Sequence, residues 1–84
     1  MSILVTQQIR MARAALGWSV SRLSDETSVS TSTINRIERE NGLSVVTPAT
    51  LKLIITTLEA AGVEFVGGPG DGPGVRLWGP GRQA

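Results

Sequence analysis

Two helix starts that lie only eleven residues apart constrain this chain more than any other feature of its sequence. Ser19 and Ser30 are residue types that favour the N-cap position, where the side-chain oxygen accepts a hydrogen bond from the first helical turn. Each serine follows a large apolar residue, Trp18 or Val29, which can pack as a hydrophobic staple on the apolar residue four positions after the serine. The spacing predicts two short helices joined by a tight turn, within residues 19–39.

The second of these helices has one apolar side and one polar side. Ile34 and Ile37 lie three positions apart and share a face that we expect to dock on the rest of the domain. The remaining side carries short hydroxyls, an amide and guanidinium groups, the chemistry that contacts base edges and phosphates in DNA. These residues are Thr31, Ser32, Thr33, Asn35, Arg36 and Arg39.

The spacing of these features resembles the lambda-repressor-like (Cro-type, Xre-like) helix-turn-helix family of bacterial and phage regulators, over about residues 6–66. The matching positions within the motif are Leu23, Ser24, Val29, Ile34 and Ile37, and the flanking segments IRMARAALGWS, RIERENG and TLKLIITTLEAAGVEF are also similar to the family. The resemblance implies a mainly α, compact domain of four to five helices, which the alternating C-terminal segment extends with a β-hairpin.

Two positions depart from the family pattern. Ser28 stands where the family usually has a turn glycine, and a serine in the left-handed conformation there should cost about 1 kcal/mol. Val20 stands where a glutamine commonly opens the first helix of the motif and contacts phosphate or supports the recognition helix. The second departure weakens the expectation of DNA contact at that point.

Two further helices are predicted on either side of the motif. The first covers residues 7–16, with Thr6 as its cap and Gly17 as its stop, and the last begins at Thr47 and Pro48 and ends at Gly62. Their apolar faces consist of Ile9, Ala12 and Leu16 in the first helix and Leu51, Ile54, Ile55 and Leu58 in the last. Asn41 and Gly42 are predicted to stop the recognition helix, before a loop over residues 43–46.

The hydrophobic period changes from helical to alternating after Gly62. Residues 63–66 and 75–78 read as two strands of a hairpin around a glycine-proline loop at 67–74, with Glu64 and Arg76 paired across them. Val63, Phe65, Val75 and Leu77 are expected to face inward. An isolated hairpin is marginal in water, so it must pack on the helices or join a second chain. Phe65, Leu77 and Trp78 are the candidate dimerisation residues, with Trp78 as a lid on the monomer's own core as the alternative.

The composition argues against several functional classes. The length of 84 residues predicts one small domain over 1–66, a hairpin at 63–78 and a flexible tail at 79–84. The chain carries a net charge of +1 and contains no cysteine and no histidine. Redox and zinc roles are therefore not expected, no cofactor or small-molecule effector is predicted, and an enzyme is the weakest hypothesis because only Asp25 and Glu26 are adjacent acids. Neither a signal peptide nor a membrane span is expected, which predicts a cytoplasmic protein.

The leading hypothesis is a sequence-specific transcriptional regulator that acts as a homodimer, most simply a repressor, on an inverted-repeat operator in double-stranded DNA. Thr31, Ser32 and Asn35 are candidates for base readout, Arg36 for a guanine or the backbone, and Ser19, Thr33, Arg39 and Arg10 for phosphates. The family's first helix runs near the DNA backbone, so Arg13 shares the phosphate hypothesis with Arg10. The alternative is a protein-binding antitoxin or antiactivator with the same fold and a protein partner.

Overall fold

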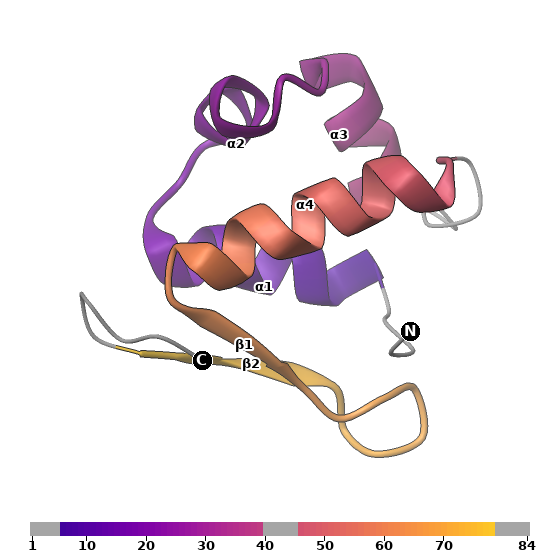
Figure 1. Cartoon of the computed structure of the whole chain (residues 1–84). Coiled ribbons are helices and arrows are strands. Elements are labelled where there is room, and N and C mark those ends of the chain that lie inside the picture. The colour runs from indigo at the N-terminus through magenta and orange to yellow at the C-terminus, as the bar shows by residue number, and fades with distance from the viewer. Residues whose placement is uncertain (1–5, 40–45, 79–84) are drawn as a thin grey trace.

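The computed structural model describes residues 6–39 and 46–78 of the chain. Their elements are α1 (Thr6–Leu16), α2 (Val20–Thr27), α3 (Thr31–Glu38), α4 (Pro48–Ala60), β1 (Val63–Val66) and β2 (Gly74–Leu77). The α2–α3 pair lies at one end of the molecule and the hairpin at the other, with α1 and α4 between them (Figure 1). This arrangement confirms the prediction of a mainly α fold of four helices with a C-terminal β-hairpin.

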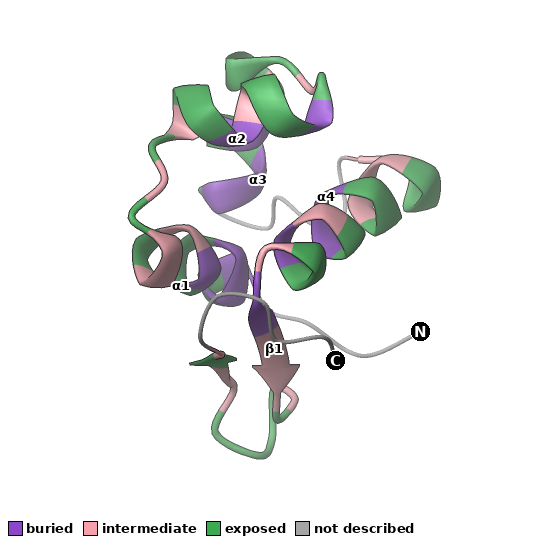
Figure 2. Ribbon diagram, turned by 60° about the vertical axis from the view of Figure 1, so that its left-hand side comes forward, coloured by how far each residue is buried: buried purple, intermediate pink, exposed green. Residues whose placement is uncertain are grey.

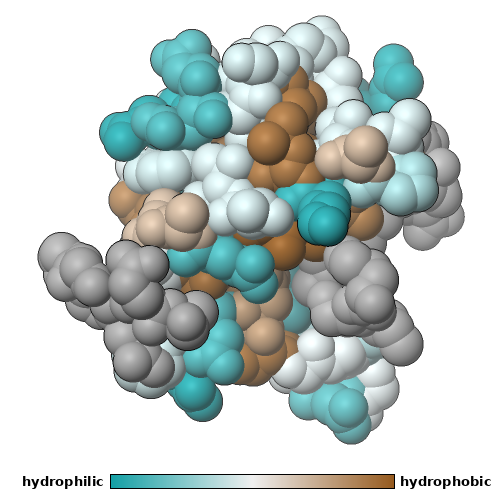
Figure 3. Space-filling view, viewed as in Figure 1, coloured by the Kyte–Doolittle hydropathy of each residue, from teal (hydrophilic) through white to brown (hydrophobic). Residues whose placement is uncertain are grey.

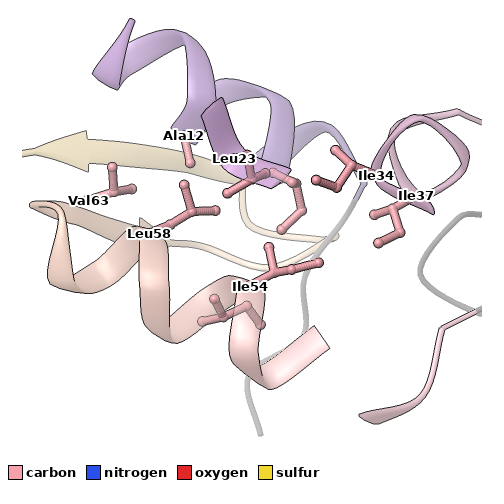
Figure 4. Packing of buried hydrophobic residues seen from close by; sticks show 9 residues of the cluster. Ala12, Leu23, Ile34, Ile37, Ile54, Leu58 and Val63 are labelled. Carbon is pink, nitrogen blue, oxygen red and sulfur yellow. The ribbon is translucent and has the colours of Figure 1, made fainter. Parts of the chain in front are cut away.

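The core forms where all four helices meet the start of β1. Figure 4 shows side chains from each of these elements converging on one apolar cluster, and in Figure 2 the buried residues of α1, α3 and α4 lie on the sides of those helices that face inward. The buried members are Ile9, Ala12, Leu23, Ile34, Ile37, Ile54, Ile55, Leu58 and Val63. The predicted docking face of the recognition helix is thus confirmed. Leu16 and Leu51, predicted as core, are half-buried at its margin.

Three helix starts are capped as the sequence predicts. The Ser19 Oγ accepts a hydrogen bond from the Arg22 amide at 3.0 Å, and the Ser30 Oγ accepts one from the Thr33 amide at 3.1 Å. Thr47 caps α4 in the same way. Helix α1 already includes Thr6, one residue earlier than predicted.

Helix α1 ends in a Schellman motif. Gly17 has a φ of 70°, the Gly17 amide donates to the Ala14 carbonyl, and the Trp18 amide donates to the Arg13 carbonyl at 2.9 Å. The predicted glycine stop is confirmed.

The prediction that Asn41 and Gly42 stop the recognition helix is wrong, because α3 already ends at Glu38 and Arg39 has an extended backbone. A tertiary contact explains the early stop: the Arg10 Nη2 donates to the Glu38 carbonyl at 2.7 Å and satisfies one of the acceptors that a helix end leaves open. Residues 41–45, including most of the predicted loop, lie outside the described residues.

The hairpin has the predicted antiparallel pairing, with Glu64 opposite Arg76 and Val63 opposite Leu77. The Arg76 Nη1 lies 3.2 Å from the Glu64 Oε1, which confirms the cross-strand ion pair. The second strand starts and ends one residue earlier than predicted. Leu77 lies opposite the buried Val63 in the register but is 52% exposed, so the expectation that it packs inward is wrong because nothing in the described chain covers it. Helix α4 leads directly into β1 and packs on it, whereas β2 packs chiefly on α1.

One contact from α1 fastens the hairpin to the helices. Gln8 is completely buried, and its Nε2 donates to the Val66 carbonyl at 3.0 Å and to the Gly74 carbonyl at 2.9 Å. These carbonyls belong to Val66 and Gly74, the residue pair that closes the hairpin loop. The buried side-chain nitrogen of Gln8 thus has two acceptors, one on each strand. The hairpin therefore packs on its own helices.

Among residues 6–39 and 46–78, no helix combines the length and the apolar character that a membrane crossing requires.

Candidate DNA-binding surface

The candidate surface is built on the outer side of α3. Thr31, Ser32, Asn35 and Arg36 are all exposed, opposite the buried pair Ile34 and Ile37. Residues three and four positions apart are neighbours on a helix, so these four side chains form one continuous polar strip. The prediction that they share a free face is confirmed, whereas their contact with DNA stays a prediction.

Arg36 and Arg39 differ from most other described cations in having no internal partner. Arg10, Arg13, Arg22 and Arg76 each donate to a carboxylate or carbonyl oxygen of the chain. Within the described part of the chain, the side chains of Arg36, Arg39 and Lys52 make no hydrogen bond or ion pair. Arg39 lies directly beyond the end of α3, in an extended backbone. Two unpaired positive charges therefore accompany the strip, one on the helix and one at its end.

Ser19 and Thr33, the weaker phosphate candidates, take part in helix capping. The Ser19 Oγ accepts from the Arg22 amide at the exposed start of α2. Thr33 is half-buried, and its Oγ1 accepts a hydrogen bond from the Ser30 Oγ at 2.9 Å. These hydroxyls define the starts of α2 and α3, and Thr33 stands apart from the exposed strip.

Arg10 and Arg13, both considered as phosphate contacts, bind the end of the recognition helix, and their contact with phosphate stays a prediction. The Arg13 Nε and Nη2 each lie 2.7 Å from an oxygen of the Glu38 carboxylate, in a bidentate pair that is largely buried. The hydrogen bond to Glu38 raises the pKa of Arg13 above its ordinary value; desolvation opposes this rise and coulombic attraction supports it. Together with the Arg10 contact to the Glu38 carbonyl, this pair fixes where α3 ends against α1.

Sequence reasoning missed the Arg13–Glu38 pair. The available signal was a glutamate that directly follows the buried Ile37 on the recognition helix, where a charge needs a partner. Arg13 supplies that partner from another helix.

The turn between α2 and α3 depends on a second residue that the sequence analysis did not single out. Thr27 is buried, its Oγ1 donates to the Leu23 carbonyl at 2.8 Å, and the same oxygen accepts from the Val29 amide at 3.2 Å. Ser28 follows with a φ of 63°, which confirms that this position requires the left-handed conformation. These contacts set the angle at which α3 leaves α2.

The exposed side of α2 is occupied by an internal cluster. The Arg22 Nε pairs with the Glu26 Oε2 at 2.8 Å, and the Arg22 guanidinium lies 4.7 Å from the centre of the Trp18 ring. Val20, which replaces the family's glutamine, is half-buried and packs against the core. The first turn of α2 therefore offers no amide side chain at this position.

The three candidate dimerisation residues occupy different environments. Phe65 is half-buried and packs against the core, whereas Leu77 is exposed. Trp78 lies on the outer side of the hairpin, where its Nε1 donates to the Glu64 Oε1 at 3.0 Å and its ring lies 5.6 Å from the Arg76 guanidinium. The indole is thus bonded to the outer face of the hairpin. Trp78 is not among the residues that pack against the core cluster, and its role as a dimer contact or as a lid stays a prediction.

Comparison with known proteins agrees with this geometry. A family model described as helix-turn-helix matches residues 9–64, which is more than half of the chain and runs from α1 into β1. No curated protein and no solved structure matches the chain.

Proposed function

Because the chain belongs to the Xre/lambda-repressor-like helix-turn-helix family of DNA-binding regulators, we propose that it is a sequence-specific, dimeric transcriptional repressor acting in the cytoplasm. Its recognition helix α3 would enter the major groove of an operator. The observation that carries this proposal is the exposed polar strip of α3 accompanied by the unpaired Arg36 and Arg39.

The chemistry of the strip suggests a division of roles. Asn35 can accept from and donate to an adenine edge, and Arg36 can donate two hydrogen bonds to a guanine. Thr31 and Ser32 lie in the first turn of α3, where their hydroxyls can read a base and the positive end of the helix dipole favours a nearby phosphate. Arg39, Ser19, Thr33 and Arg10 are proposed as phosphate contacts of lower weight. The side chains of Ser19, Thr33 and Arg10 already make hydrogen bonds at helix ends, and Arg39 lies beyond the end of α3.

We propose the hairpin as the dimer contact, with Leu77 and Trp78 at its centre and Phe65 as support. The exposure of Leu77 supports this assignment, because a second copy of the chain that covers this apolar side chain would remove its surface from water. A two-fold dimer would place two recognition helices on half-sites about 34 Å apart, one turn of the duplex. Occupation of such an operator within a promoter would block transcription without any enzymatic step.

The proposal is tested by selection of the purified protein against randomised duplex DNA at moderate salt, where non-specific phosphate contacts do not dominate. We expect an enriched inverted repeat whose half-sites are one helical turn apart. A single enriched half-site would retain sequence-specific binding and remove the dimer from the proposal. No enriched motif from folded protein would refute DNA readout and favour the protein-binding alternative.

A further inference from the structure

Helix α4 carries a second regular stripe, on the side that faces away from the core. Ala49, Leu53, Thr56 and Ala60 are all exposed, and their spacing of four, three and four positions is the heptad spacing of a helix that packs on another helix. Leu53 is 45% exposed and is one of the three large apolar residues that are exposed in the described chain. The opposite side of α4 is the core stripe that contains Ile54 and Leu58.

The composition of α4 is unusual for a helix at the surface. Only Lys52 and Glu59 among its 13 residues are charged, so apolar and small residues occupy much of its outer side. Figure 3 looks onto the face of the molecule that carries α4, and apolar surface is visible there between the polar groups. A helix that is apolar on both sides is normally covered on both sides.

The positions of Lys52 and Glu59 indicate which partner fits the outer side of α4. Lys52 and Glu59 lie seven positions apart, hence on the same flank of the stripe, and neither side chain has a partner within the described residues. In an antiparallel pair related by a two-fold axis, each flank meets the same flank of the other copy. Lys52 of each copy then lies opposite Glu59 of the other, and the charges match twice.

We propose that the outer side of α4 binds α4 of a second copy of this chain, in an antiparallel arrangement. In this register Leu53 packs against Thr56 of the partner and Ala49 packs against Ala60. The small residues allow the two helices to approach closely. The contact is separate from the hairpin and does not depend on DNA binding.

The size of the surface determines its strength. A helix of 13 residues is about 20 Å long. The area that one stripe of this length can bury is smaller than the roughly 800 Å² per partner that a stable complex buries. The α4 contact is therefore weak and reversible.

Sedimentation equilibrium from micromolar to millimolar concentration tests the proposal with charge reversal. Lys52→Glu and Glu59→Lys each turn both attractive pairs into repulsive ones, and each should weaken the association about tenfold. The double reversal Lys52→Glu/Glu59→Lys should restore it. An equimolar mixture of the two single variants should also associate, because the heterotypic pair again matches opposite charges.

The matched control is Asp71→Lys, which makes the same charge change as Glu59→Lys on an exposed residue of the hairpin loop and should leave the association unchanged. The series is repeated in a Leu77→Lys chain, where the hairpin contact is disrupted and only α4 can associate. Circular dichroism verifies that each variant is folded. Equal average mass for all variants, or failure of both the double reversal and the mixture to restore association, would overturn the proposal.

Discussion

Ser28 adopts a backbone conformation that a side chain disfavours. Its φ of 63° lies in the left-handed region, where the β-carbon of a non-glycine residue meets the following carbonyl oxygen. Ser28→Gly should therefore stabilise the fold by about 1 kcal/mol. Chemical denaturation measures this change. Ser28→Ala is the control, because it keeps the β-carbon and should give no gain; equal stabilisation by both substitutions would contradict the argument.

Arg36 is the residue on which the DNA proposal depends most. If it reads a base, Arg36→Ala should weaken binding to the selected operator by about 1 to 3 kcal/mol and relax the preference at one position in each half-site. Titration against a set of single-position operator variants measures both effects. Arg36→Lys is the control, because it keeps the charge but loses the planar fork that binds a guanine. Full affinity and an unchanged base preference in Arg36→Lys would show that Arg36 contributes only net charge.

Of the three ion pairs among the described residues, the Arg13–Glu38 pair, which joins the ends of α1 and α3, is the one shielded from solvent. Glu38→Gln keeps the shape of the side chain but removes the charge that Arg13 binds, so we expect a loss of about 1.5 to 3 kcal/mol in the free energy of unfolding. Glu26→Gln makes the same chemical change in the exposed Arg22–Glu26 pair and should cost less than about 1 kcal/mol. Urea denaturation compares the two, and similar losses would exclude a special role for the Arg13–Glu38 pair.

At the scale of the whole molecule, the hairpin proposal makes a prediction about assembly. Leu77→Lys places a charge on an exposed strand residue, so the monomer should stay folded while the dimer is lost. Light scattering should then give the monomer mass at concentrations where the parent chain is dimeric. Met11→Lys is the control, because Met11 is an exposed apolar residue on α1 and lies outside the proposed contact. A dimer that persists in Leu77→Lys would place the main interface elsewhere.

The local elements followed from the sequence because their causes are local. Ser19, Ser30 and Thr47 cap helices through hydrogen bonds to residues three positions away, and the apolar period of α3 and α4 marks the sides that become buried. The left-handed turn at Ser28 and the Glu64–Arg76 pair also depend on near neighbours or on simple strand register. The same local pattern was enough to predict the exposed strip of the recognition helix.

The tertiary structure alone decided how these elements are joined. Gln8 bonds to carbonyls 58 and 66 residues away, and Arg13 binds a glutamate 25 residues away. The local sequence does not identify either partner, because a polar side chain next to an apolar stripe fits an exposed position equally well. The early end of α3, the exposure of Leu77 and the use of Arg10 as a helix cap arise from the same cause. Local hydrogen bonds and the hydrophobic period therefore determined where the helices lie in the sequence. Packing between distant segments determined which polar side chains remain exposed and available to bind DNA.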